Sequence, residues 1–288
     1  MAYPFNHSIC NEIFHPPGVA EHEYTPYTFA SACGKIREIG YAGIEVAPFT
    51  LAESPQWITV ADRKTYRSTI VNAGLQFVGL HWLMLSPKGL HVTTPDKGLR
   101  ERSWDHVRHL IDLCADLGDG GVMVFGSPGQ RNATGGSTLE DATKRFRDGF
   151  AAIAKHAEDR RVTVLVEALP RAQSNVVNTL AEAVEIVKYC DSPAVQTMFD
   201  SHNAADETES HSEVITKYWQ WIRHVHVNEM DGKHCGRGDY DFTTLLEVLA
   251  HNQYKGWVSL EAFDFSFGAE TIARESLAHL RLAAGLET

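Results

Sequence analysis

Short runs rich in β-branched and aromatic residues alternate with longer amphipathic runs along the 288-residue chain. This alternation is typical of parallel strands joined by crossover helices. Two of the helical runs begin with predicted capping boxes, Ser137 with Glu140 and Thr179 with Glu182. The eight runs that we predict to be strands are residues 6–13, 43–49, 76–80, 121–125, 162–167, 195–200, 224–228 and 257–261.

The side chains at the ends of these strands favour a closed barrel over an open sheet. Alternate side chains of a strand point the same way, so Thr163 and Leu165 share a face with Glu167, the acid at the carboxyl end. Asp200 and Glu261 end the corresponding faces of two later strands. A barrel gathers such strand ends around one axis, and it needs about 250 residues. We therefore predict an α/β protein, a (β/α)8 TIM barrel that forms a single domain over residues 1–288.

Charge and composition narrow the classes of partner. The formal net charge of -11 and the lack of a long apolar run predict that neither nucleic acid nor a membrane is a partner. The amino-terminal residues contain no basic segment followed by an apolar run, so we expect a cytoplasmic protein. The cysteines are scattered without a CxxC pair, which predicts free thiols and not a zinc ribbon or a redox motif.

Three acids end predicted strands, and one histidine lies near the end of another; these are the last four strands, and a barrel would bring the four side chains together. Glu167, Asp200, His226 and Glu261 form an oxygen-rich set that suits one divalent metal ion, with Mn²⁺ expected and Mg²⁺, Co²⁺ or Zn²⁺ as alternatives. A chelated hydroxy-carbonyl substrate would lose a proton next to its carbonyl and form a metal-stabilised enediolate. Glu167 and Glu261 would then act as catalytic base and acid. These residues predict an isomerase or epimerase whose partner is a small sugar or polyol ketone.

Five segments of the second half carry a resemblance to a known family. They are Val-Leu-Val-Glu167, Met-Phe-Asp200-Ser-His202, His-Val-His226-Val-Asn-Glu, Trp-Val-Ser-Leu-Glu261 and Gly236-Arg-Gly238-Asp-Tyr-Asp241-Phe242. Together they resemble the sugar phosphate isomerase/epimerase family, which has the xylose-isomerase-like barrel. The resemblance implies the same four metal ligands. It also implies proton exchange at C3 by the two glutamates, as in ketose 3-epimerases, so 3-epimerisation of a ketose is the leading prediction.

Three features depart from those epimerases, whose aspartate motif has its histidine three residues after the aspartate, whereas His202 follows Asp200 by two. They usually carry a second glutamate six residues after the first, where this chain has Gln173, and an arginine six residues after the metal histidine, where it has Gly232. The resemblance therefore extends to a wider set that includes hydroxypyruvate-type isomerases. A metal-dependent dehydratase, a lyase of the inosose or dehydroshikimate type, is the alternative. An AP endonuclease-like hydrolase is disfavoured, because the chain lacks the further histidines that several zinc ions would need. Barrels of this kind commonly pair, so a dimer or tetramer is expected.

Further side chains near the predicted strand ends are candidates for contact with a substrate. Arg131 is a candidate for binding a phosphate, whereas His224 is predicted to be a hydrogen-bonded histidine of the core. The Gly236-x-Gly238 segment lacks a third glycine, so we expect no nicotinamide or flavin. The predicted substrate-binding residues are His202, His81, Trp82, Arg171, Gln173, Glu45 and Arg237.

Overall fold

Eight parallel strands form a closed barrel in the computed structural model, which describes residues 5–18 and 27–286. Each strand pairs with the next one in the chain, and the first pairs with the last, so the sheet has no free edge. The predicted (β/α)8 barrel is confirmed. The strands are β1 (Asn6–Cys10), β2 (Gly43–Val46), β3 (Gln76–Leu80), β4 (Val122–Phe125), β5 (Thr163–Val166), β6 (Val195–Asp200), β7 (Ile222–Val227) and β8 (Trp257–Leu260).

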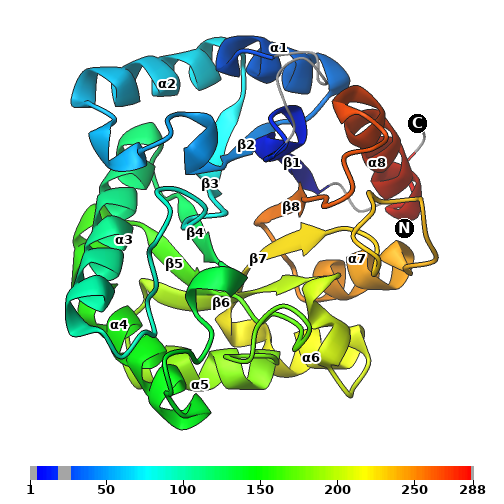
Figure 1. Ribbon diagram of the computed structural model, residues 1–288. Coiled ribbons are helices and arrows are strands. Elements are labelled where there is room, and N and C mark those ends of the chain that lie inside the picture. The colour runs from blue at the N-terminus through cyan, green and yellow to red at the C-terminus, as the bar shows by residue number, and fades with distance from the viewer. Residues whose placement is uncertain (1–4, 19–26, 287–288) are drawn as a thin grey trace.

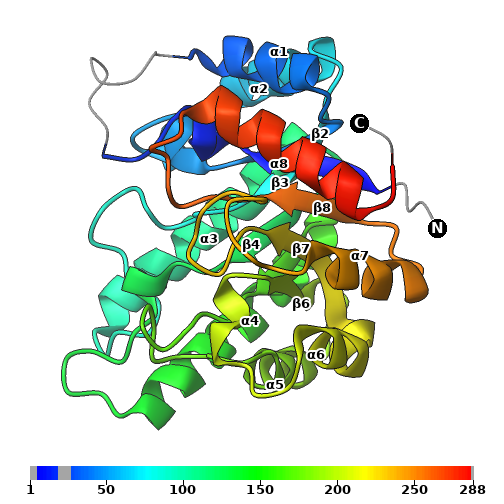
Figure 2. The same ribbon diagram turned by 90° about the vertical axis from the view of Figure 1, so that its right-hand side faces the viewer.

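Within the described residues a helix follows each strand, and the helices form a ring outside the barrel (Figure 1). Figure 2 shows the barrel from the side, where α8 lies next to α1 and so closes the ring. No helix in this part of the chain is long and apolar enough to cross a membrane. The helices are α1 (Phe29–Ile39), α2 (Val60–Asn72), α3 (Lys97–Leu117), α4 (Leu139–Arg160), α5 (Leu180–Cys190), α6 (His211–Tyr218), α7 (Phe242–His251) and α8 (Ala269–Ala283).

Two separate apolar layers hold the barrel. Inside it, Val124, Leu165 and Met198 form a small cluster of their own. Val164 and Val166 belong to the larger core between the strands and the helices. Leu165 therefore points inward and its neighbours outward, as the alternation in β5 predicted. The polar side chains at the carboxyl end of the barrel stand on top of this inner apolar layer.

An aromatic cluster fills the space between β4, α3 and α4. Trp104, Phe125, Phe146 and Phe150 contact one another with ring centroids 5.0 to 6.5 Å apart. All four side chains are buried. Packing of large rings in offset and edge-to-face contacts contributes stability beyond the area that they bury. The cluster therefore holds α3 and α4 against β4, the strand that leads into one wall of the candidate site.

The first two strands end earlier than predicted. The structure ends β1 at Cys10, because the next residues turn into the 3-10 helix η1 (Asn11–Phe14). The structure ends β2 at Val46, because a proline begins the 3-10 helix η2 (Pro48–Thr50) two residues later. Proline lacks the N–H that a further strand residue would donate. Between η1 and α1, residues 19–26 lie outside the described residues.

The cap of α4 lies one residue later than predicted. The side chain of Thr138, and not that of Ser137, accepts the N–H of Asp141. The cap of α5 agrees with its prediction in part, because the Thr179 hydroxyl accepts the N–H of Glu182. The carboxylate of Glu182 accepts the N–H of the residue before Thr179 instead of closing a capping box. Ser, Thr and Asp compete closely as caps, so neighbouring candidates are hard to separate by sequence.

The contact between α3 and α4 predicts the effect of one substitution. A Cβ atom at Gly149 would lie 1.9 Å from Cε2 of Trp104, so Gly149→Ala must displace the indole ring. We expect it to lower the free energy of unfolding by about 1–3 kcal/mol, as overpacked cores do. Gly34→Ala on α1 is the matched control, because no heavy atom lies within 4 Å of its Cβ position. Urea unfolding measures both. Equal changes in the two variants would contradict this description of the contact.

Candidate functional site

The four predicted metal ligands meet at the carboxyl end of the barrel. Glu167 follows β5, Asp200 ends β6, His226 lies in β7 and Glu261 follows β8. One ligand atom from each of the four lies within 4.8 Å of the other three. His226 Nδ1 is 3.0 Å from a Glu261 oxygen and 3.7 Å from an Asp200 oxygen. We call these four residues the ligand group.

Burial makes the ligand group electrostatically costly. Each of its four residues is at most 5% exposed. Burial, together with the negative charges of Glu261 and Asp200, raises the pKa of Glu167 to about 8. Burial and the charge of Glu261 raise the pKa of Asp200 to about 6. Carboxylates crowded away from water repel one another, and a divalent cation would remove this repulsion. The donor set of three carboxylates and one imidazole therefore fits a divalent metal ion.

Neighbouring donors hold the carboxylates in place. Asn203 Nδ2 donates to Glu167 at 2.8 Å, and the backbone N–H of Asn203 donates to Asp200 at 2.8 Å. Trp82 Nε1 donates to Glu261 at 2.7 Å. Such contacts orient ligating side chains before a metal binds. Asn203 is the first residue of the 3-10 helix η5 (Asn203–Asp206). Sequence reasoning missed it, although it directly follows the predicted His202.

A cavity of about 750 Å³ opens beside the ligand group. Four of the predicted substrate-binding residues line it together with Glu167 and Glu261, namely His81, Trp82, Gln173 and His202. Gln173 Nε2 lies 3.3 Å from His202 Nε2, so these two side chains form one polar edge. Phe263 also lines the cavity, and its ring stacks with Trp82 at 6.3 Å between centroids. Phe263 was not predicted, because an aromatic residue two positions after a strand end gives no distinct sequence signal.

The other three predicted substrate-binding residues lie outside this cavity. Glu45 is fully buried in the barrel, where its carboxylate contacts His224 and His226. Arg171 turns to the surface and pairs with Asp206 at 3.6 Å. Arg237 turns away and pairs with Glu275 at 2.6 Å. Each finds an oppositely charged or hydrogen-bonding partner away from the cavity, which sequence spacing does not reveal.

Arg131 does not face the cavity as a phosphate ligand, which corrects that prediction. Its guanidinium is fully buried and donates to the backbone carbonyls of Phe125, Gly126, Glu167 and Val177. Burial lowers the pKa of Arg131 to about 9. All three guanidinium nitrogens donate to groups inside the protein, so Arg131 is not placed to bind a substrate anion. Arg131 instead ties the loop that carries Glu167 to the end of β4.

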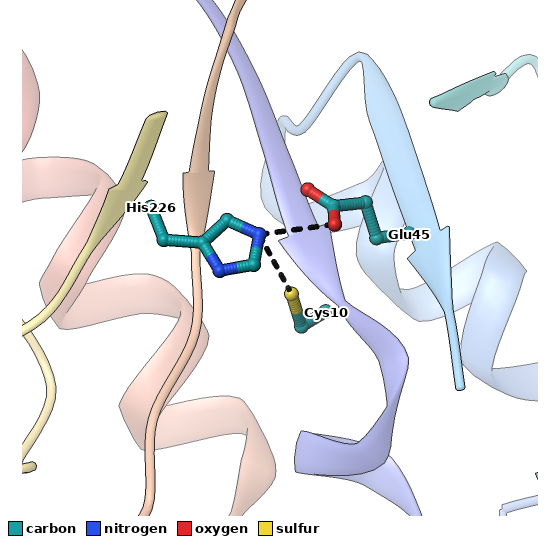
Figure 3. A group of neighbouring side chains, drawn as sticks. All are labelled: Cys10, Glu45 and His226. Atoms are coloured by element: carbon teal, nitrogen blue, oxygen red, sulfur yellow. Dashed lines mark hydrogen bonds and ion pairs between the residues drawn. The ribbon is translucent and has the colours of Figure 1, made fainter. Parts of the chain in front are cut away.

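A second layer of polar side chains lies beneath the ligand group. His226 Nε2 is 3.0 Å from a Glu45 oxygen and 4.0 Å from Cys10 Sγ (Figure 3). The other Glu45 oxygen accepts from His224 Nε2 at 2.6 Å, which agrees with the prediction that His224 is a hydrogen-bonded core residue. Glu12 contacts His81 in the same interior. These pairs satisfy polar groups that would otherwise be buried alone.

Comparison with known proteins places the chain in a family. The family described as "Xylose isomerase-like TIM barrel" matches residues 33–283. This chain belongs to that family. Its sequence is 22% identical to the 3-dehydro-D-guloside 4-epimerase of Escherichia coli over 92% of this chain and 98% of the relative. It is 32% identical to the D-psicose 3-epimerase of Ruminiclostridium cellulolyticum, but over only 42% of this chain and 41% of the relative.

The fold of this chain agrees with its membership of the family. The solved structure of a D-psicose 3-epimerase with D-tagatose from Clostridium cellulolyticum superimposes with a TM-score of 0.80 at 20% identity. The superposition covers 98% of this chain and 99% of that one. At this level of identity, the likeness establishes a shared fold. The relatives are epimerases, members of the isomerase class.

The crowded carboxylates predict how the stability of the metal-free protein depends on pH. A carboxyl whose folded pKa lies above its ordinary value contributes stability below that ordinary value, and this is lost as the pH rises through the folded pKa. Glu167 has its pKa raised from 4.5 to about 8, and Asp200 from 3.8 to about 6. Between pH 5 and pH 9 the melting temperature of the EDTA-treated protein should therefore fall.

Calorimetry with and without metal checks this expectation. Mn²⁺ at about 100 times its dissociation constant should add about 2.7 kcal/mol of stability and reduce the slope above pH 6. The Glu167→Gln variant cannot ionise at this position, so its metal-free protein should lose most of the slope. A wild-type melting temperature that stays constant or rises from pH 5 to pH 9 would contradict the account.

Proposed function

We propose that this protein is a sugar epimerase that depends on a divalent metal, with Mn²⁺ as the expected ion. The observation that carries the proposal is the arrangement of the two glutamates. Glu167 and Glu261 belong to the ligand group and also line the cavity, whereas Asp200 and His226 are not among the residues that line it. Two of the four side chains are thus in reach of both a metal and a substrate. This is the arrangement that proton transfer at a chelated sugar requires.

The two glutamates differ in their affinity for a proton. In the metal-free protein, burial and neighbouring charges raise the pKa of Glu167 to about 8. Burial also acts to raise the pKa of Glu261, but His226, His81 and the hydrogen bond from Trp82 together lower it below its ordinary value. Pairs of groups whose environments separate their pKa values are suited to the roles of acid and base. In the metal-free protein at neutral pH, Glu261 is therefore ionised and free to take up a proton, whereas Glu167 holds a proton that it can donate, and the roles exchange in the reverse reaction.

The barrel brings the two glutamates to the substrate from different sides. They follow β5 and β8, which are three strands apart in the barrel order. One can remove a proton from a carbon next to a carbonyl while the other returns a proton from another direction, which inverts the carbon. A divalent cation held by the ligand group would supply positive charge that stabilises negative charge developing on the neighbouring oxygen. Asn203 and Trp82 keep the two carboxylates oriented during the transfer.

The cavity suits a substrate without phosphate. Among the described residues that line it there is no lysine or arginine, and Asp231 adds another acid. Phosphate is normally bound by cationic side chains or by helix amino termini. The polar edge of Gln173 and His202 can bond to hydroxyls. The stacked rings of Trp82 and Phe263 offer an apolar wall for the C–H face of a sugar. We therefore propose a neutral keto-sugar as the substrate.

Two neutral substrates are candidates. A free ketose that is epimerised at C3 is the first, because D-psicose 3-epimerase is among the relatives and the ligand group contains two cavity-lining glutamates. A 3-keto glycoside that is epimerised at C4 is the second. It is favoured by the size of the cavity and by the match to the 3-dehydro-D-guloside 4-epimerase over 98% of that relative. Both reactions exchange a proton next to a carbonyl.

A panel of substrates in deuterated water separates these reactions. With Mn²⁺ present, we expect deuterium to enter one carbon next to the carbonyl of a free ketose or a 3-keto glycoside. Mass spectrometry and NMR detect this incorporation. Phosphorylated ketoses should react at least about tenfold more slowly, because the cavity offers them no cationic partner. Inosose and dehydroshikimate test the lyase alternative. An ultraviolet-absorbing product of water loss, or a preference for phosphorylated sugars, would contradict the proposal.

The role of Glu261 predicts the effect of an isosteric substitution. Glu261→Gln should preserve the fold and lower kcat by at least about 100-fold, since acid–base groups typically contribute factors of 10² to 10⁴. Glu158→Gln is the matched control, because Glu158 is an exposed glutamate on α4, and its turnover should equal that of the wild type. Circular dichroism checks the fold of both. If Glu261→Gln turned over substrate at the wild-type rate, this would contradict the two-glutamate mechanism.

A further inference from the structure

His226 is contacted on both sides of its imidazole ring. On one side Nδ1 faces the ligand group, 3.0 Å from Glu261 and 3.7 Å from Asp200. On the other side Nε2 is 3.0 Å from a Glu45 oxygen (Figure 3). Glu45 lies on β2, which is not a neighbour of β7 in the barrel, so this contact crosses the barrel interior. The two nitrogens of the ring therefore have distinct surroundings.

We propose that Glu45 is a positioning residue that sets the metal affinity of the site by fixing the tautomer of His226. The inference rests on the proposed function, in which the ligand group holds a divalent metal ion. When Nε2–H donates to Glu45, the lone pair of the neutral ring is on Nδ1, which is the nitrogen that faces Glu261 and Asp200. Histidine ligands commonly donate their second ring nitrogen to a carboxylate in this way.

Glu45 is itself held so that it can do this. Its residue is fully buried, and its second oxygen accepts from His224 Nε2 at 2.6 Å. Both carboxylate oxygens thus accept from imidazoles, and neither is free to rotate toward the cavity. β2 pairs with β1 at this position, with Glu45 opposite Cys10. The rigid sheet on this side fixes the distance between Glu45 and the ring of His226.

A second metal bound by Cys10, Glu45 and His226 explains the contacts less well. Their ligand atoms lie close enough for a cation. Such an ion would take the second nitrogen of His226, however, so that one ring would bridge two metals. The Nε2 atom already lies at hydrogen-bond distance from Glu45, whereas Cys10 Sγ is 4.0 Å away. The geometry therefore favours a hydrogen bond from His226 to Glu45.

Glu45→Gln tests the role of the hydrogen bond while keeping the size of the side chain. An amide presents an oxygen at one of the two carboxylate positions and an NH₂ group at the other, so it can replace the carboxylate toward only one of His224 and His226. We expect the dissociation constant for Mn²⁺, measured by titration calorimetry, to rise roughly 10- to 100-fold, as it does when such supporting partners are lost. Glu45→Asp keeps the two acceptor oxygens at a shorter reach and should give a smaller increase.

Glu12→Gln is the matched control for loss of charge. Glu12 is also a fully buried glutamate of the barrel interior, and it pairs with His81 instead of a member of the ligand group. Its removal takes away one negative charge without altering the bond to His226. The Mn²⁺ dissociation constant of Glu12→Gln should stay within about threefold of the wild type. An equal increase in both variants would mean that Glu45 acts only through its charge, and this would overturn the proposal.

Nitrogen-15 NMR of histidine reads the tautomer directly and needs no variant. In wild-type protein with Mg²⁺, His226 should carry its proton on Nε2, and in Glu45→Gln this preference should weaken. A proton on Nδ1 in the wild type, or unchanged Mn²⁺ affinity and tautomer in a folded Glu45→Gln variant, would overturn the proposal. If the wild type bound no divalent metal, the proposed function would fail as well. Normal wild-type binding with an unaffected variant would refute the role of Glu45 alone.

Discussion

Repulsion among three buried carboxylates governs the carboxyl end of this barrel. Glu167, Asp200 and Glu261 come from separate strands, yet they share one small volume with His226. A divalent cation offsets such repulsion, and without one the group must retain protons, as the raised pKa values of Glu167 and Asp200 express. A closed barrel can impose this arrangement, because the apolar layers beneath and around it supply the folding energy that the site costs.

The surroundings of the ligand group are as ordered as the group itself. Arg131 ties the loop of Glu167 to β4 through backbone carbonyls, and Trp82 holds Glu261. Three non-glycine residues near the cavity or its supporting loops, Trp82, Ser127 and Val177, have positive φ angles. Such conformations are costly and persist where surrounding contacts over-determine them, which is common at functional sites. These contacts hold the side chains of the candidate site in fixed positions, which would reduce the reorganisation that the proposed catalysis requires.

Sequence reasoning predicted the fold and the meeting of these four side chains for one physical reason. Strand periodicity places Glu167 and Asp200 at inward-facing carboxyl ends, and closure of the barrel then brings these ends together. The same reasoning did not place the side chains of Arg171, Arg237 and Glu45, which lie outside the cavity, because partner choice among charged side chains depends on the three-dimensional paths of loops. Helix caps such as that of α4 and the ends of β1 and β2 shifted by a few residues, since neighbouring residues offered competing caps and turns.

The most direct measurement of the central claim is anomalous diffraction from a crystal of this protein grown with Mn²⁺, with data collected on both sides of the manganese absorption edge. The account predicts one strong anomalous peak within bonding distance of carboxylate oxygens of Glu167, Asp200 and Glu261 and of His226 Nδ1. A map with no peak there at saturating Mn²⁺, or with its principal peak bound by other residues, would contradict the account.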